Sequence, residues 1–148
     1  MDYTDKQIHF EQIHQLLKNE EGHIFIFSLD KIKKIIQNKN AIIAIDKERV
    51  IGFVKFYKKM SDKILFRNIW QCGSLVVHPD YRNRGIGKQL IKKLLDKIAL
   101  NDLPIAVVRK TNINSENFFR KIGAIEAINA KTSKETFYFF DLTNIRNI

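Results

Sequence analysis

The 148-residue sequence contains one cysteine, Cys72, two prolines and no long apolar run. A single cysteine excludes an internal disulfide and any metal site built from several cysteines. The four histidines lack carboxylate partners at a recognisable ligand spacing, so we expect no metal. A membrane span needs roughly 20 apolar residues, and a secretory signal needs a basic segment before an apolar one; neither is visible. We therefore expect a cytoplasmic protein.

Acidic residues are scarce: the chain has 16 of them against 26 basic residues, which gives a formal net charge of +10. This balance favours polyanionic partners such as nucleic acid, an acidic surface or a phosphorylated cofactor. A lysine-rich proteome that solvates its proteins with lysine explains the same charge without a partner. The chain has no repeats, low-complexity tracts or flexible linkers, so we expect a single domain over residues 1–148.

Apolar spacing predicts alternating helices and strands. Helices are expected at Lys6–Leu17, after the capping residue Ser28, around Leu90–Ile98 and at Ser115–Lys121. Strands are expected at Ala41–Ile45, Val50–Tyr57, Ile64–Val77, Pro104–Val108, Ala124–Ile128 and Thr136–Leu142. The first two strands form a hairpin, and the third has an irregularity near Gly73. The strand–helix–strand step around Gly85 predicts neighbouring parallel strands inside a mixed sheet.

The stretch VVHPDYRNRGIG, from Val76 to Gly87, lies between a predicted strand and a predicted helix. A helix N-terminus presents unpaired N–H groups and the positive end of a dipole, which together bind phosphate. Gly85 and Gly87 leave the backbone accessible, and Arg82 and Arg84 add positive charge. The stretch fits neither the P-loop pattern nor the dinucleotide pattern G-x-G-x-x-G. We interpret it as a cradle for a pyrophosphate group.

What this stretch does match is R-x-x-G-x-G after a strand that ends in V-x-P, which resembles the acyl-CoA signature of the GNAT superfamily of N-acetyltransferases. A second stretch, NINSENFFRKIGA at Asn112–Ala124, resembles the second motif of that family. The resemblance implies a three-layer α/β (α+β) fold, a mixed central sheet of about six to seven strands with about four helices. It also implies that the sheet splays between the long strand ending at Val77 and the strand Pro104–Val108.

The family resemblance implies acetyl-CoA as co-substrate, held mainly by backbone groups. Leu75, Val76 and Val77 would offer backbone groups to the pantetheine arm, as an added strand would. The pyrophosphate would lie on the amides of Arg82, Asn83, Arg84, Gly85, Ile86, Gly87 and Lys88. From the second motif, Asn112, Ser115 and Phe119 would complete the cofactor site. A backbone contact at Val77 would also hold the thioester and its oxyanion.

Two departures from the family pattern concern the general acid and the general base. Phe119 occupies the position of the family's tyrosine, which often protonates the leaving thiolate. The segment Trp70–Ser74 carries no glutamate that would act as base. The candidate substitutes are Tyr138, Cys72, His78 and Glu126. Of these, Tyr138 and Cys72 are the two that we name as catalytic candidates, although a small buried packing residue is the simpler explanation of Cys72.

We therefore expect an enzyme, an acyltransferase that moves an acetyl group from acetyl-CoA to a primary amine of a small molecule, such as an amino acid, or of a peptide. The amine would attack the thioester directly in a ternary complex. The alternative is a degenerate module that binds or senses acyl-CoA without turnover, which Phe119 motivates. We expect no nucleic-acid partner, because the basic residues are scattered, and no membrane partner. The acceptor stays open, as does the choice between monomer and homodimer.

Overall fold

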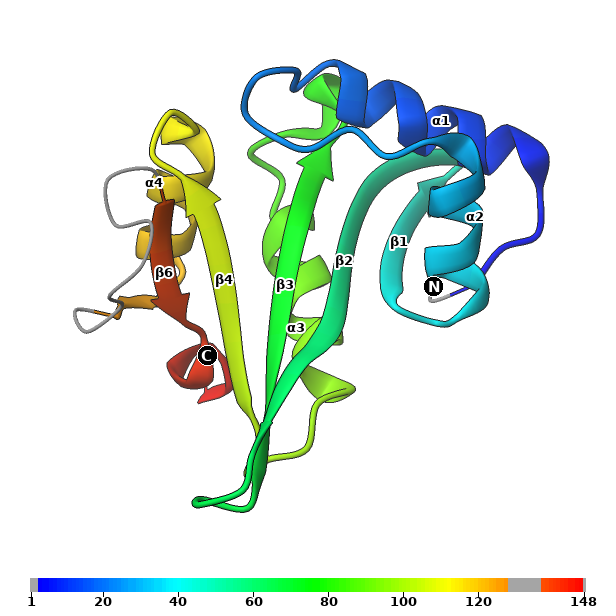
Figure 1. Ribbon diagram of the computed structural model, residues 1–148. Coiled ribbons are helices and arrows are strands. Elements are labelled where there is room, and N and C mark those ends of the chain that lie inside the picture. The colour runs from blue at the N-terminus through cyan, green and yellow to red at the C-terminus, as the bar shows by residue number, and fades with distance from the viewer. Residues whose placement is uncertain (1–2, 128–136, 148) are drawn as a thin grey trace. The chain divides into compact units, whose positions relative to one another are not determined.

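The computed structural model of the chain describes residues 3–127 and 137–147 (Figure 1). Its helices are α1 (Gln7–Lys18), α2 (Leu29–Gln37), α3 (Ile86–Asp96) and α4 (Ile113–Lys121), with the short 3-10 helices η1 (Pro79–Tyr81) and η2 (Thr143–Asn147). Its strands are β1 (Ala41–Asp46), β2 (Arg49–Asp62), β3 (Arg67–Val77), β4 (Leu103–Arg109), β5 (Ile125–Glu126) and β6 (Phe137–Asp141). No helix within these described ranges is long and apolar enough to cross a membrane.

The six strands form one mixed sheet in the order β1-β2-β3-β4-β6-β5. β1 and β2 are antiparallel, whereas β3 and β4 are parallel, with Ile69–Cys72 paired to Leu103–Ala106. β6 is antiparallel to both β4 and β5. The sheet and its four α-helices confirm the predicted α/β fold. The parallel ladder ends at Cys72, and Ser74 has a positive φ of 55°, close to where the sequence predicts an irregular strand.

The first of two compact units comprises the chain up to Lys55 together with Ser74–Leu94. α1 and α2 lie side by side in it (Figure 1). The buried faces of both helices pack with β2 in a core that includes Phe10, Ile13, Leu17, Ile32, Ile36 and Phe53. The Ser28 side chain accepts the Lys31 N–H, which confirms the predicted cap of α2. α3 packs so closely on β2 that a Cβ at Gly52 would lie 2.9 Å from the Leu90 side chain.

The second unit comprises Phe56–Gly73 and the chain from Leu95 onward. The outer part of β2 and the start of β3 form its hairpin. Its buried side chains include Ala106, Val108, Phe119, Phe140, Leu142 and Ile145. Asp102 holds the loop before β4, because its carboxylate accepts hydrogen bonds from the Asn68 N–H at 2.9 Å and from Trp70 Nε1 at 3.0 Å.

The predicted strand Ile64–Val77 is wrong at its start. Residues 64–66 lie in a turn, β2 continues to Asp62, and β3 begins only at Arg67. The side chains of residues 64–66 are exposed in this turn. The two predicted closing strands are present as β5 and β6; their predicted ends at Ile128 and Thr136 fall outside the described residues.

Candidate functional site

The turn between β3 and α3 is the centre of the candidate site and lies in the first unit. At the end of β3, the peptide group between Val77 and His78 is hydrogen-bonded through both its N–H and its carbonyl. The His78 N–H donates to the Ile51 carbonyl at 2.7 Å, and the Val77 carbonyl accepts from Arg82 Nε at 3.3 Å. His78 Nδ1 then accepts the Asp80 N–H at 3.1 Å and starts η1. Protein contacts alone therefore fix the strand end to which the sequence assigns the pantetheine arm.

Arg82 is engaged with protein oxygens. Besides the Val77 carbonyl, its guanidinium binds the carboxylate of Glu20, in the turn after α1. Its backbone N–H donates to the Pro79 carbonyl at 3.4 Å. The sequence predicts that Arg82 offers positive charge to a phosphate. In the structure its side chain lies between two loops and ties the turn before α3 to the turn after α1, and the phosphate contact stays a prediction.

Tyr81 organises the positive charge beside the turn. Its hydroxyl donates to Asp46 Oδ2 at 2.8 Å. The guanidinium carbons of Arg49 and Arg84 lie 5.6 and 5.2 Å from the centroid of its ring. Cation–π contacts of this kind hold a guanidinium in place without neutralising it. Arg84 therefore keeps its charge next to Gly85.

The backbone of the turn suits an anion. Asn83 and Gly85 have positive φ values of 63° and 81°. This region favours glycine, and a Cβ at Gly85 would have no protein atom within 4 Å, so the space beside it is open. The Gln89 N–H makes the first helical hydrogen bond, to the Gly85 carbonyl at 3.0 Å. The N–H groups of Ile86–Lys88 precede that bond and have no partner within the helix.

The second motif lies in the second unit and begins with a helix cap. Asn112 is buried, and its Oδ1 accepts the Ser115 N–H at 3.2 Å at the start of α4. Its own N–H donates to the Arg109 carbonyl at 2.8 Å. Asn112 therefore stabilises α4 as its N-cap. The cap uses Oδ1, and the predicted cofactor contact of Asn112 stays a prediction.

Phe119 belongs to the aromatic core of the second unit. It is 3% exposed, stacks on Phe140 with ring centroids 5.9 Å apart, and meets Phe118 edge-on at 5.1 Å. Tyr138 is the other ring beside Phe140, at 6.1 Å between centroids. Phe140 thus brings together two residues that the sequence analysis selects, Phe119 and Tyr138.

The ring of Tyr138 faces two cations. Lys110 Nζ lies 5.1 Å and the Arg120 guanidinium carbon 5.2 Å from its centroid. Arg120 also forms ion pairs with Glu116 at 3.0 Å and Glu126 at 3.4 Å. Glu126, an alternative base in the sequence analysis, is therefore held in an ion pair, whereas Tyr138 lies in positively charged surroundings.

Cys72 has the properties of a packing residue. It is 1% exposed within β3, and burial raises the pKa of its thiol to about 12. A thiol with that pKa stays protonated at neutral pH and supplies no thiolate. Across residues 3–127 and 137–147, no three His, Cys, Asp or Glu side chains gather where they could hold a metal ion.

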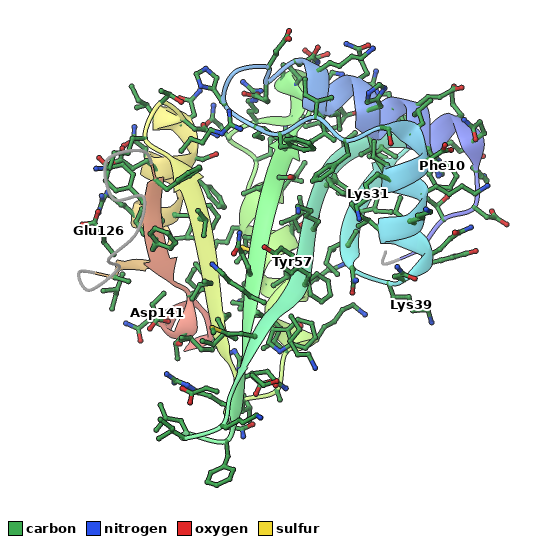
Figure 2. All side chains as sticks on the ribbon, viewed as in Figure 1. Phe10, Lys31, Lys39, Tyr57, Glu126 and Asp141 are labelled. Atoms are coloured by element: carbon green, nitrogen blue, oxygen red, sulfur yellow. The ribbon has the colours of Figure 1, made fainter. Side chains whose placement is uncertain are left out.

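Two charge contacts of the first unit were not predicted from the sequence. Lys55 Nζ lies 4.6 Å from the centroid of the Phe27 ring, and burial, followed by the charge of Lys31, lowers the pKa of the Lys55 ammonium group. Lys31 extends from the first turn of α2 (Figure 2). The second contact joins Glu20 and Arg82, which are 62 positions apart. No motif or periodicity links either pair, so only the fold reveals them.

Comparisons with known proteins identify relatives of this chain. A model of the acetyltransferase (GNAT) family matches residues 9–124. An L-2,4-diaminobutyric acid acetyltransferase of Shouchella clausii (strain KSM-K16) is 37% identical over 84 residues, which are 55% of this chain and 44% of that protein. The uncharacterized N-acetyltransferase ycf52 of Pyropia yezoensis is 28% identical over 101 residues, 66% of this chain and 55% of that protein. The chain spans about half the length of these curated relatives.

Solved structures share the fold. A chain in the crystal structure of the NatC complex bound to Gag peptide and CoA matches with a TM-score of 0.69 and 19% identity, over 94% of this chain and 93% of that chain. An identity this low shows a common fold and leaves the substrate to be argued from the site itself.

Proposed function

The chain belongs to the acetyltransferase (GNAT) family, and we propose that it transfers an acetyl group from acetyl-CoA to a primary amine. The observation that carries the proposal is the turn before α3. There the N–H groups of Ile86–Lys88 have no helical partners, and the space beside Gly85 is open. A pyrophosphate fits such a turn, because it is anionic and must approach the backbone closely. Arg84, held on Tyr81, adds a positive charge.

The other proposed cofactor contacts follow the sequence assignment with one change. Leu75, Val76 and Val77 bind the pantetheine arm through backbone groups. The turn from Asn83 to Lys88 binds the pyrophosphate. The contributions that we propose from the second unit are Asn112, Ser115 and Phe119. The change concerns Arg82: because it donates to Glu20, Val77 and Pro79, its role is to position the turn.

Acetyl-CoA supplies an acetyl group that is activated as a thioester. The chain supplies orientation, an oxyanion donor and a proton. We assign the oxyanion contact to the Val77 backbone N–H, since the following peptide is fixed by Ile51 and Arg82. We assign proton donation to the departing thiolate to Tyr138, because Cys72 is buried and Glu126 is paired with a cation. The amine nitrogen attacks the thioester carbonyl directly in a ternary complex. The proton that it loses on forming the amide passes to water, from which Tyr138 regains its own.

For the acceptor, we propose a small amine that also carries a carboxylate. The positive charge of Lys31 acts on the ammonium group of Lys55 in the first unit, and a carboxylate beside these lysines would be attracted to both. The name of the Shouchella clausii relative points the same way, because L-2,4-diaminobutyric acid has a carboxylate and a side-chain amine.

The test is thiol release from acetyl-CoA with a panel of amines, each supplied as the free carboxylate and as its amide. We expect release with at least one carboxylate-bearing amine and weaker release with its amide. Acetyl-CoA at 100 times its Kd should stabilise the protein by about 2.7 kcal/mol, which raises its Tm. Binding of acetyl-CoA without thiol release for any amine of the panel would favour the second candidate function, an acyl-CoA sensor. The buried Phe119 supports this candidate. No binding at millimolar acetyl-CoA would reject both.

A further inference from the structure

The turn between β2 and β3 exposes three large apolar side chains in a row. Ile64, Leu65 and Phe66 are 87%, 58% and 85% exposed, and Met60 on the adjoining strand is 54% exposed. Figure 2 shows side chains projecting from the end of this hairpin. Scattered apolar residues are common on protein surfaces, but a run of them usually has a function. We call residues 60–66 the hairpin tip.

The hairpin tip is an ordered turn held by specific contacts. Asp62 Oδ1 accepts the N–H groups of Ile64 and Leu65 at 3.1 and 3.2 Å. Phe66 has a φ of 51°, in the left-handed region that favours glycine and disfavours a bulky side chain. Strained residues of this kind cluster at functional sites. A glycine would form this turn more easily, so the aromatic ring is present despite a conformational cost.

Basic residues lie within and beside the hairpin tip. They are Lys58, Lys59, Lys63 and Arg67. Between Tyr57 and Asn68 the sequence has a single acid, Asp62, which lies 3.9 Å from Arg67 and accepts the N–H groups of the turn. The three lysines are exposed. The hairpin therefore ends in an apolar surface surrounded by positive charge.

From this arrangement we propose that the hairpin tip docks on a membrane surface that contains anionic phospholipid. Its apolar side chains enter the boundary between headgroups and acyl chains, and its lysines pair with lipid phosphates. The positive charge requires an anionic partner and opposes docking on a second copy of this chain.

The proposal is independent of the acetyl-transfer proposal. The hairpin tip belongs to the second unit, whereas the turn before α3 belongs to the first. Docking of a surface loop also needs no membrane-spanning helix. The proposal replaces the sequence-based expectation of no membrane partner, which was drawn from the missing apolar run alone.

Sedimentation with lipid vesicles tests the proposal. We expect the protein to bind phosphatidylcholine vesicles that contain phosphatidylglycerol, to bind less as salt is raised, and to bind pure phosphatidylcholine at least tenfold more weakly. Phe66→Gly relieves the strain of the positive φ and removes the aromatic ring. It should therefore keep or raise the Tm while weakening binding to the anionic vesicles at least tenfold. Lys63→Ala should weaken binding about fivefold. Leu100→Ser, at a side chain that is also 87% exposed, is the matched control and should bind like the parent.

Several results would overturn the proposal. One is the absence of binding to anionic vesicles, and another is equal binding to neutral ones. If Phe66→Gly binds anionic vesicles as tightly as the parent, net charge alone accounts for the attraction between protein and membrane. Self-association is the remaining alternative. It would be supported if the parent dimerises as its concentration rises, the Phe66→Gly variant does not, and both bind vesicles equally.

Discussion

Replacement of Gly85 by alanine isolates what the turn before α3 contributes to cofactor binding. Gly85 has a φ of 81°, where alanine is strained, although the new methyl group would meet no protein atom within 4 Å. The strain costs about 1–2 kcal/mol, and the lower entropy of the unfolded chain offsets about 0.4–1 kcal/mol of it. We expect the free energy of unfolding to fall by about 1 kcal/mol, which lowers the Tm by roughly 2–4 °C.

The expected effect on acetyl-CoA binding is larger than the effect on folding. The methyl group occupies open space that we assign to the pyrophosphate. Loss of one hydrogen bond to a charged group costs about 1.5–3 kcal/mol. This corresponds to a Kd that is roughly 10- to 150-fold higher.

Gly22→Ala is the matched control. Gly22 has a φ of 89°, and a Cβ there would also meet no atom within 4 Å, but the residue lies outside every segment to which we assign the cofactor. Because it is two positions from Glu20, Glu20→Gln is titrated beside it. It should lose similar stability and keep its affinity for acetyl-CoA. The assay is calorimetric titration of the two variants and the parent, with thermal unfolding of each. If Gly85→Ala binds as tightly as the parent, or Gly22→Ala loses as much affinity, the assignment of the turn to pyrophosphate binding is refuted.

Three further perturbations test other parts of the structure. Glu20→Gln should weaken acetyl-CoA binding if Arg82 positions the turn; tighter binding in a titration would mean that the released guanidinium reaches the phosphates itself. Phe119→Tyr puts a hydroxyl into the aromatic core and should reduce the free energy of unfolding by about 1–3 kcal/mol, with acetyl-CoA affinity kept; equal denaturation midpoints would contradict this. Hydrogen bonds from the Asn68 backbone and from the Trp70 side chain lower the pKa of Asp102 in the folded protein. The stability that Asp102 contributes is therefore fully present above its unfolded pKa of about 3.9 and is lost as pH falls through the lower folded pKa. Trp70 is the single tryptophan, so its fluorescence reports unfolding across this acidic range. Asp102→Asn should lose less stability on acidification than the parent. An identical pH dependence of the two proteins would contradict a stabilising role of the Asp102 carboxylate.

The sequence predicted correctly those features that depend on residues close together in the chain. The helix around Leu90–Ile98 follows from apolar residues at helical spacing, and the cap at Ser28 from its hydroxyl. The positive φ of Gly85 fits the requirement for glycine in the turn. These features depend on residues a few positions apart, so the sequence contains the information needed to place them.

The failures have a physical cause as well. Ile64–Phe66 is apolar, and burial is the usual fate of such a run, so the sequence favoured a strand where the structure has an exposed turn. The contact between Glu20 and Arg82 joins residues from distant turns, and ion-pair partners follow no periodicity.

The contacts around Tyr81 have a kinetic consequence. Arg49 and Arg84 rest on its ring, and Asp46 holds its hydroxyl, so these guanidinium groups are restrained before a ligand arrives. Immobilising a flexible side chain during association costs about 0.5–1.5 kcal/mol, and here folding has already ordered both. A preorganised positive field accelerates encounter with an anion more than it slows departure. The association rate of acetyl-CoA should therefore fall steeply with ionic strength in stopped-flow measurements, while its dissociation rate stays nearly constant.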